Sequence, residues 1–177
     1  MARNPSTSGQ LLSLDFLEGR EGLPAAKRLL KSYSGPSGIS MWDASSIFFE
    51  MDGLDLDEEP SARAIVLLYA ADLSFRLRWE ILPALEEGKS IVAAPYVETV
   101  FAFGSVAGLP KRWMNEVLRF APKASAGFRV NGTSSGKLGA ATSGFVEFCS
   151  VALKRDLRPG FAAYFDELER RGRCRTI

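Results

Sequence analysis

Short apolar segments alternate along this chain with longer segments of helical periodicity, and this alternation restricts the fold more than any other feature. Residues 11–17 form a strand-length apolar run broken only by Ser13 and Asp15, and residues 90–94 form a nearly continuous one. Residues 39–43 read as a further strand that ends in an acid. Strands that are apolar on both faces are typical of a parallel sheet covered by helices on each side. The sequence therefore predicts an α/β fold.

Residues that start or stop helices bound the segments between these strands. Ser61 is the predicted N-cap of a long helix over residues 61–87, which Gly88 ends. Pro110 opens a helix over residues 111–120. The other predicted elements are a helix over residues 23–33, a helix from Pro95 through Phe103, a weak strand over residues 127–130, a helix over residues 145–171 with a break at Pro159 and Gly160, and a terminal strand over residues 174–177.

A single domain is expected over residues 11–177, preceded by a flexible N-terminal arm over residues 1–10. A chain of 177 residues that is 46% hydrophobic can bury well over half of its unfolded surface in one core. Residues 131–143 are mostly glycine, serine, threonine and alanine, which predicts a mobile loop.

Composition excludes several classes of function. Twenty-two Lys and Arg residues balance 21 Asp and Glu residues, so no overall charge favours a nucleic acid or an anionic membrane as partner. Without histidine the chain cannot build a Ser-His-Asp or Cys-His nucleophile, and Cys149 and Cys174 are expected to be ordinary thiols with no metal site. No segment has the apolar length of a membrane span or a signal peptide, so a cytoplasmic location is expected.

Ligands of parallel α/β sheets bind where the strands end. The candidate site residues are therefore residues 18–22, Asp43 and residues 95–99. The stretch FLEGREGLPAAKRLL begins like a phosphate-binding loop, with Glu18, Gly19 and Gly22 after an apolar strand. The Gly-Lys-Ser or Gly-Lys-Thr that should close such a loop is absent.

A longer ordered set of features lies in AIVLLYAADLSFRLRWEILPALEEGKSIVAAPYVETVFAFGSVAGLPKRWMNEVLRFAPK, residues 64–123. This stretch resembles thymidylate kinase, a P-loop nucleoside monophosphate kinase, and the resemblance extends over residues 11–123, with a similar closing helix and last strand. It implies a P-loop kinase-like five-stranded parallel sheet with helices on both faces, in which residues 11–17 form the central strand. It also implies ATP and Mg²⁺ as cofactors if the protein is active.

The chain departs from this family first in the phosphate loop. Ala25 and Ala26 stand where the family has the lysine that holds ATP phosphates and the hydroxyl that helps place Mg²⁺. Pro24 removes one N–H donor from the loop. Glu21 keeps an acid that in the family lies near the sugar of the monophosphate. Lys27 comes two residues late.

Further departures remove charges that the family uses. Ala94, Pro95 and Tyr96 replace an Asp-Arg-Tyr motif, and Leu73 replaces the arginine that binds the acceptor nucleotide. Arg20 is the one arginine in the degenerate loop that could compensate. Loss of a single preorganised donor commonly costs about 10²- to 10³-fold in rate, so several losses in one site predict impaired catalysis.

Several residues have both a functional and a structural interpretation. Glu21 is either a ligand residue or an acid favoured at a helix N-terminus. Asp72, the one acid in an apolar helix seam, is either a ligand residue or, as we favour, a buried acid paired with Arg76 or with a backbone donor. Tyr69 and Phe103 match the family's base pocket, although aromatic residues on such faces more often form core. The predicted nucleotide pocket comprises Asp43, Tyr69, Asp72, Tyr96, Thr99 and Phe103.

Three functions follow from these observations. The first is a thymidylate-kinase-like protein with impaired catalysis that binds a nucleotide, such as a pyrimidine monophosphate, or a protein partner. The second is an active kinase that uses Arg20, Glu21 and Lys27 in an unorthodox loop with ATP and Mg²⁺. The third is an interaction module with a vestigial cleft. Because the family dimerises through long helices, a homodimer through residues 61–87 is also expected.

Overall fold

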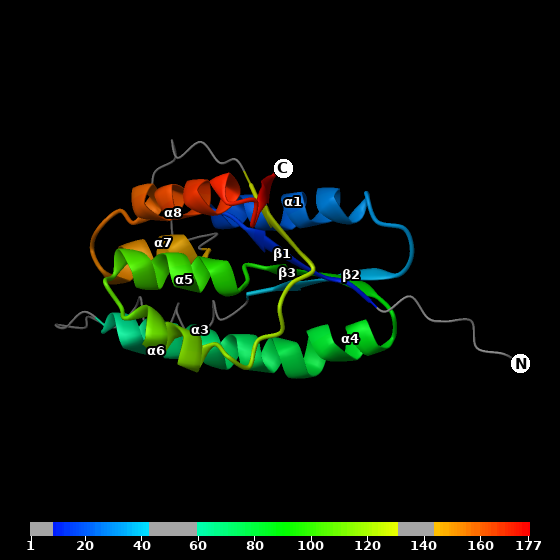
Figure 1. Cartoon of the computed structure of the whole chain (residues 1–177), viewed down its shortest axis with the longest axis horizontal. Coiled ribbons are helices and arrows are strands. Elements are labelled where there is room, and N and C mark those ends of the chain that lie inside the picture. The colour runs from blue at the N-terminus through cyan, green and yellow to red at the C-terminus, as the bar shows by residue number, and fades with distance from the viewer. Residues whose placement is uncertain (1–8, 43–59, 131–143) are drawn as a thin grey trace, which may run out of the picture.

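Five parallel strands form one sheet at the centre of the computed structural model, which describes residues 9–42, 60–130 and 144–177 (Figure 1). The strand order is β2-β3-β1-β4-β5, and every neighbouring pair is parallel. The strands are β1 (Leu11–Asp15), β2 (Ser37–Met41), β3 (Ser90–Ala94), β4 (Ala126–Arg129) and β5 (Arg175–Thr176). The predicted parallel sheet with a central first strand is confirmed, although that strand ends two residues earlier than expected.

Helices cover both faces of the sheet, as predicted. They are α1 (Gly19–Leu30), α3 (Ala62–Arg76), the π-helical turn η1 (Leu77–Ile81), α4 (Leu82–Glu86), α5 (Val97–Val106), α6 (Lys111–Val117), α7 (Phe145–Ala152) and α8 (Arg158–Arg170). Leu12 and Leu14 of β1 pack with α1 in one apolar core, whereas Leu11 faces the larger core that contains α3, α5, α7 and α8. Alternate residues of β1 thus face two cores, which is why all five residues of the strand are buried.

The long helix begins and ends as its sequence predicts. The Ser61 hydroxyl accepts a hydrogen bond from the Ala64 N–H at 3.1 Å, which is an N-cap. Helices α3, η1 and α4 follow one another without a break, and Gly88 stops the helix with φ of 79°, a conformation that glycine adopts without strain. Figure 1 shows this helix along one side of the molecule, below the sheet in that view.

Two helix predictions need correction. The helix expected over residues 23–33 begins at Gly19, four residues earlier. The break expected at Pro159 and Gly160 lies before Arg158 instead, and Pro159 occupies the first turn of α8, where a missing N–H costs nothing. Cys149 and Cys174 are both free and buried. No helix among the described residues is long and apolar enough to cross a membrane.

Candidate functional site

The segment expected to form an open phosphate loop is instead the beginning of α1. Glu18 is the N-cap residue with extended backbone angles, and Gly19 is the first helical residue. The Glu21 N–H already donates to the Glu18 carbonyl oxygen at 3.0 Å. The backbone of residues 19–22 therefore forms a helical turn and not a loop whose N–H groups surround a ligand.

Both glycines retained from the loop motif serve close packing. A Cβ at Gly22 would lie 2.5 Å from Cζ of Phe16, so the ring of Phe16 occupies the space beneath that residue. A Cβ at Gly144 would lie 2.8 Å from the Gly19 Cα. The chain at Gly144 thus rests directly on Gly19, at the start of α1. The ring of Phe16 thus packs against Gly22, and Gly144 packs against Gly19.

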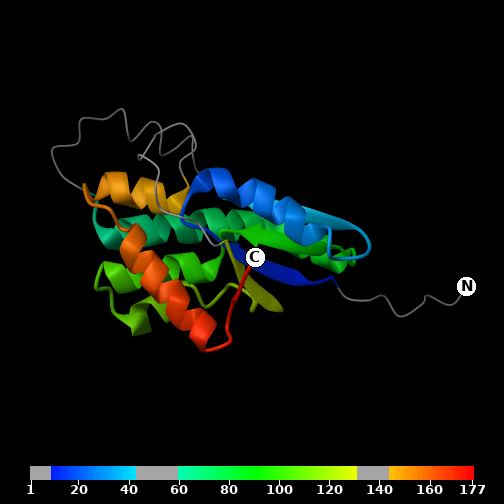
Figure 2. The same cartoon turned by 90° about the horizontal axis from the view of Figure 1, so that it is seen from above.

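A carboxylate from α7 lies at the N-terminus of α1. Oε2 of Glu147 accepts hydrogen bonds from the Gly19 N–H at 3.0 Å and from the Gly144 N–H at 2.6 Å. In Figure 2, α7 and α1 meet end to end, with their N-terminal ends facing one another. Each helix N-terminus carries about half a positive charge, so one carboxylate between two of them is stabilising.

The carboxylates of Glu18 and Glu21 also lie at this edge, together with the guanidinium of Arg20, and Arg158 interacts with Glu18 and Glu147. Glu18 is buried, and its Oε2 pairs with the Arg20 guanidinium at 2.5 Å. Burial raises the pKa of Glu21 above its ordinary value, the Glu18 carboxylate raises it further, and Arg20 opposes both. Oε1 of Glu18 and Oε2 of Glu21 are buried without a hydrogen-bond partner in the described part of the chain.

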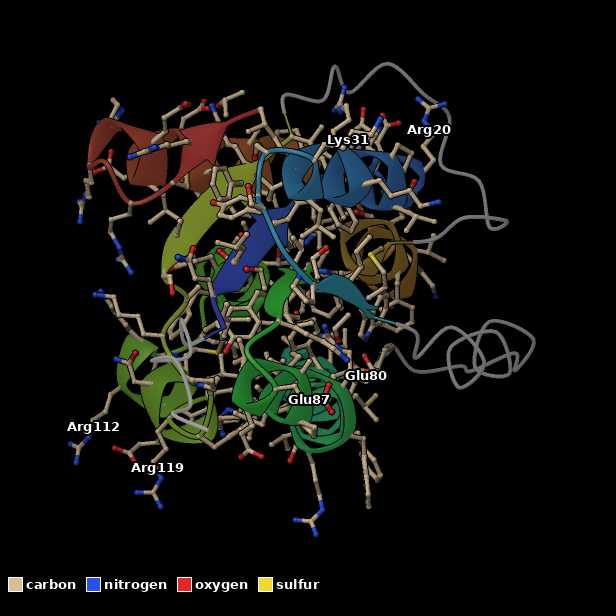
Figure 3. All side chains as sticks on the ribbon, turned by 90° about the vertical axis from the view of Figure 1, so that its right-hand side faces the viewer. Arg20, Lys31, Glu80, Glu87, Arg112 and Arg119 are labelled. Atoms are coloured by element: carbon tan, nitrogen blue, oxygen red, sulfur yellow. The ribbon has the colours of Figure 1, made fainter. Side chains whose placement is uncertain are left out.

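The residues considered for phosphate binding lie in the core, farther along α1 or at the rim of the molecule. Ala25 and Ala26, which the resemblance aligns with the lysine and the hydroxyl of the family's loop, are fully buried and pack in the core beneath α1. Lys27 is exposed and lies eight residues after Gly19, roughly 12 Å along the helix at 1.5 Å per residue. Figure 3 shows the Arg20 side chain at the rim of the molecule, pointing away from the sheet.

The predicted aromatic walls lie in the core. Tyr69 and Phe103 are both 0% exposed. The ring of Phe145, the first residue of α7, meets Tyr69 edge-on with a centroid separation of 4.8 Å and Phe103 at 5.7 Å. Trp42 completes the group, 5.4 Å from Phe145. An aromatic side chain of the protein therefore occupies the space between the residues expected to hold a base.

A buried polar cluster joins α3 to the end of β3. The Tyr69 hydroxyl lies 2.9 Å from the Pro95 carbonyl oxygen and 3.0 Å from that of Tyr96. The Arg76 guanidinium donates to Oδ2 of Asp72 at 2.7 Å and to the Pro95 carbonyl at 3.3 Å. The expected pairing of Asp72 with Arg76 is thus confirmed, and this cluster holds the segment after β3 against α3.

Asp15 was not identified as a site residue from the sequence, yet it organises the start of α5. Its Oδ1 accepts from the Thr99 hydroxyl at 2.6 Å and lies 3.4 Å from the Tyr96 N–H. Burial raises the pKa of Asp15 to about 7, although the Thr99 hydrogen bond acts in the opposite direction. The Tyr96 hydroxyl donates to the Pro122 carbonyl at 2.6 Å. The hydroxyl groups of Tyr96 and Thr99 therefore both make hydrogen bonds within the protein.

The predicted site residues fall into separate groups in the structure. Residues 18–22 lie together at the start of α1, Tyr69 and Phe103 lie around Phe145, and Lys27 lies apart from both. Asp43 lies outside the described residues. Among the described residues no group of three acids or cysteines is arranged to hold a metal ion.

Sequence reasoning also missed Phe145 and Glu147. The spacing from Gly144 to Glu147 has the form of a helix cap, in which an acid at the third helical position accepts from the cap residue. That signal predicts the contact with Gly144. It cannot predict the contact with Gly19, which is 128 residues away in the sequence.

Comparison with known proteins confirms the resemblance to thymidylate kinases. No family model matches the chain. A probable thymidylate kinase of Pyrococcus abyssi is 36% identical over 63 residues, which are 36% of this chain and 31% of that protein. One of Pyrococcus horikoshii is 36% identical over 73 residues, 41% of this chain and 34% of that protein. The matched segment therefore spans about a third of the length of these curated relatives.

The likeness in fold extends over nearly the whole chain. The crystal structure of thymidylate kinase from Ehrlichia chaffeensis superposes with a TM-score of 0.62 and covers 96% of this chain and 88% of its own. Sequence identity in that superposition is 14%. The chain thus has the fold of a P-loop kinase and partial sequence similarity to thymidylate kinases.

Proposed function

We propose that this chain is a thymidylate-kinase-like protein with strongly impaired phosphoryl transfer, which binds a pyrimidine monophosphate weakly and assembles through its long helix. The observation that carries the proposal is the Glu147 carboxylate on the Gly19 N–H. In a P-loop kinase the start of this helix belongs to the ATP phosphates. Here an internal anion holds the same position.

The residues at this edge do not fit ATP with Mg²⁺. Catalysis of phosphoryl transfer depends on positive groups that stabilise charge on the transferring phosphoryl. In this chain Glu18, Glu21 and Glu147 gather where those groups would be needed. Each missing donor costs about 10²- to 10³-fold in rate, so combined losses leave no useful kinase activity.

The active-kinase alternative depends on Lys27 acting at the phosphate loop. Its Cα lies roughly 12 Å along α1 from Gly19, which is beyond the reach of a lysine side chain to the first helical turn. Arg20 is already paired with Glu18. Of the three residues that this alternative requires, Lys27 is too far away and Arg20 is already paired, and Glu21 cannot supply positive charge. This favours the impaired protein.

The acceptor side keeps the aromatic residues that the resemblance assigns to the base. Tyr69 and Phe103 keep their places, and Phe145 lies between them. Stacking on an aromatic side chain contributes about 1–3 kcal/mol per base. Because Leu73 and Pro95 stand where the family has arginines, the phosphate adds little, and the binding of a pyrimidine monophosphate is expected to be weak.

The outer face of the long helix supports the homodimer. Phe75 and Trp79 are each 68% exposed, and Leu67, Ala71 and Leu82 are exposed on the same helix. The spacing of four, four, four and three residues places them on one side. A monomer rarely exposes so continuous an apolar stripe, which is typical of an association surface.

The order of side chains along this stripe favours an antiparallel pairing of two copies. With Phe75 at the two-fold axis, residue numbers that add to 150 face one another, so Trp79 of one copy meets the small Ala71 of the other. The same rule places Arg63 beside Glu87. A large side chain thus packs against a small one, and an arginine lies beside a glutamate. A second copy of the chain would therefore cover the apolar stripe.

A shallow groove extends this surface. It is lined by Ser74, Leu77, Arg78, Trp79, Leu82, Pro83, Glu86 and Phe120. Figure 3 shows Arg112 and Arg119 pointing outward on the α6 side and Glu80 and Glu87 on the long helix. The same groove is the observation that favours the second candidate, an interaction module whose partner is a different protein. A cytoplasmic location remains a prediction for either candidate.

Calorimetric titration tests the nucleotide part of the proposal. We expect no heat of binding for ATP below millimolar concentration, with or without Mg²⁺, and weak binding of dTMP in preference to dTDP. Micromolar ATP binding that Lys27→Ala abolishes and Glu21→Ala leaves intact would show that the active-kinase alternative is correct.

Sedimentation at micromolar concentration tests the assembly. A homodimer is expected to have twice the mass of the 19.3 kDa chain. Phe75→Arg, which places a charge at the proposed axis, is expected to give the monomer. Val151→Arg, at an exposed position on α7, is the matched control and should leave the dimer intact. A monomer for the unaltered chain contradicts the dimer.

A further inference from the structure

We propose that α7 is an internal lock on the nucleotide cleft. Its Glu147 takes the place of a ligand phosphate at the start of α1, and its Phe145 takes the place of a ligand base among Trp42, Tyr69 and Phe103. The identity of the excluded ligand rests on the proposed function. The lock itself rests on the contacts of α7.

The first part of the lock is electrostatic. The N-termini of α1 and α7 face one another, and each has backbone N–H groups with no helical acceptor. Two such ends repel unless an anion lies between them. Oε2 of Glu147 satisfies one N–H from each end, at Gly19 and Gly144. The junction therefore requires a negative charge, and the chain provides its own.

The second part of the lock is steric. Gly144 approaches the Gly19 Cα so closely that a side chain at Gly144 has no room. Phe145 is buried against Tyr69 and Phe103, and Val146 and Cys149 of the same helix are also buried. A ligand cannot reach the start of α1 or the aromatic group while α7 lies in this position.

The two parts act together because they share one helical turn. Phe145 and Glu147 are two residues apart in α7, so any movement that withdraws the carboxylate from Gly19 also withdraws the ring from Tyr69. Nucleotide then binds only to molecules in which α7 has moved. The apparent Kd is the intrinsic Kd divided by the fraction of such molecules, so a closed lock weakens binding without altering the binding residues.

Rescue by an added anion tests the electrostatic part. Glu147→Ala leaves the two helix ends without their anion, and the Tm is expected to fall by several degrees. Inorganic phosphate at about 50 mM should restore part of that loss, more than sodium chloride of equal ionic strength does, because it competes for the vacated position. The unaltered protein and Glu116→Ala, an exposed control on α6, should show only the small general stabilisation by phosphate, and the excess in Glu147→Ala is the specific effect.

A loss of packing alone would not respond to phosphate in this way. Equal responses of Glu147→Ala to phosphate and chloride overturn the lock. If the alanine variant is not recovered in a folded state, Glu147→Gln, which removes only the charge, gives the same comparison. An adventitious effect of phosphate on the whole protein is detected in the Glu116→Ala control.

The affinity for dTMP tests the coupling and separates the lock from the proposed function. We expect Glu147→Gln and Phe145→Ala to bind dTMP at least fivefold more tightly than the unaltered chain. Phosphate rescue without dTMP binding by any variant supports the lock and contradicts the mononucleotide assignment. Equal dTMP binding by all three proteins supports that assignment and overturns the lock.

Discussion

The carboxyl edge of the sheet and the outer face of the α3–α4 helix differ in how fully the chain covers them. At the sheet edge, Phe145 fills the aromatic group and Glu147 caps two helix ends. On the outer helix face, Phe75 and Trp79 remain largely exposed. The chain thus covers the first surface with its own side chains and leaves large apolar side chains exposed on the second.

The inner and outer faces of α3 show this contrast within one helix. Tyr69, Leu73 and Arg76 face inward and are buried, with Arg76 paired to Asp72. Leu67 and Phe75 face outward without cover in the monomer. Burial of apolar surface stabilises by about 25 cal/mol per Å² removed from water. Covering the outer face of α3 with another surface would therefore stabilise a complex. One face of α3 is therefore buried in the core, and the other face is exposed.

The largest expected effect compares two phenylalanines, one on each surface. Phe145→Ala should lower the free energy of unfolding by about 3–5 kcal/mol, because it removes a buried ring and leaves a cavity among Trp42, Tyr69 and Phe103. Phe75→Ala should change it by no more than about 0.5 kcal/mol in dilute solution, where monomer predominates. Urea unfolding measures both values. Similar losses for the two variants would remove the distinction between the surfaces.

A second expected effect concerns pH and belongs to the closed edge. The pKa of Asp15 is about 7 in the folded chain against an ordinary value of 3.8, so the folded state keeps a proton that the unfolded state loses. This contribution to stability is complete below about pH 4 and is lost as pH rises to about 7. The groups that face the carboxyl are the Thr99 hydroxyl, the Tyr96 N–H and the Glu98 carboxylate.

Asp15→Asn removes this dependence. The stability of the variant relative to the unaltered chain should rise between pH 4 and pH 7 by up to about 4 kcal/mol, at 1.36 kcal/mol per unit of pKa shift, and then stay constant. Urea unfolding at pH 4.5, 5.5, 6.5 and 7.5 measures it. A difference that does not change with pH would show that Asp15 is ionised in the folded protein throughout this range.

The smallest expected effect lies on the open face. Trp79→Ala should weaken the proposed dimer by about 2 kcal/mol, or roughly 30-fold in Kd, because exposed tryptophans at the centre of an interface commonly dominate its energy. Sedimentation equilibrium measures the change. Val151→Ala on α7 is the control. An unchanged Kd for Trp79→Ala would move the interface to another surface.

Local sequence signals predicted the parts of the fold that depend on local chemistry. Ser90–Ala94 were predicted as a strand because almost every residue in the run is apolar, and the structure gives β3 the same bounds. Ser61 was predicted as an N-cap because its hydroxyl can accept a backbone N–H, which it does. The Asp72–Arg76 pair was predictable because residues four apart on a helix are neighbours.

The closed cleft was not predictable in the same way, because it depends on contacts between distant segments. Gly19 and Gly22 indicated an open loop, but helix α1 begins at Gly19 where Gly144 and Glu147 approach it. Asp15 read only as a polar interruption in a strand, since its partner Thr99 lies 84 residues away. The residue types indicated that this edge of the sheet carries a site, whereas contacts between distant segments decide which side chains occupy it.

The backbone N–H of Gly19 reports most directly on the central claim that an internal carboxylate holds the phosphate position. In an amide NMR spectrum of the unaltered protein, millimolar ATP with Mg²⁺ should leave the Gly19 and Gly22 resonances unmoved. Glu147→Gln, by contrast, should shift the Gly19 resonance because its charged acceptor is lost. Saturable shifts of both glycines at micromolar ATP in the unaltered protein would contradict the claim.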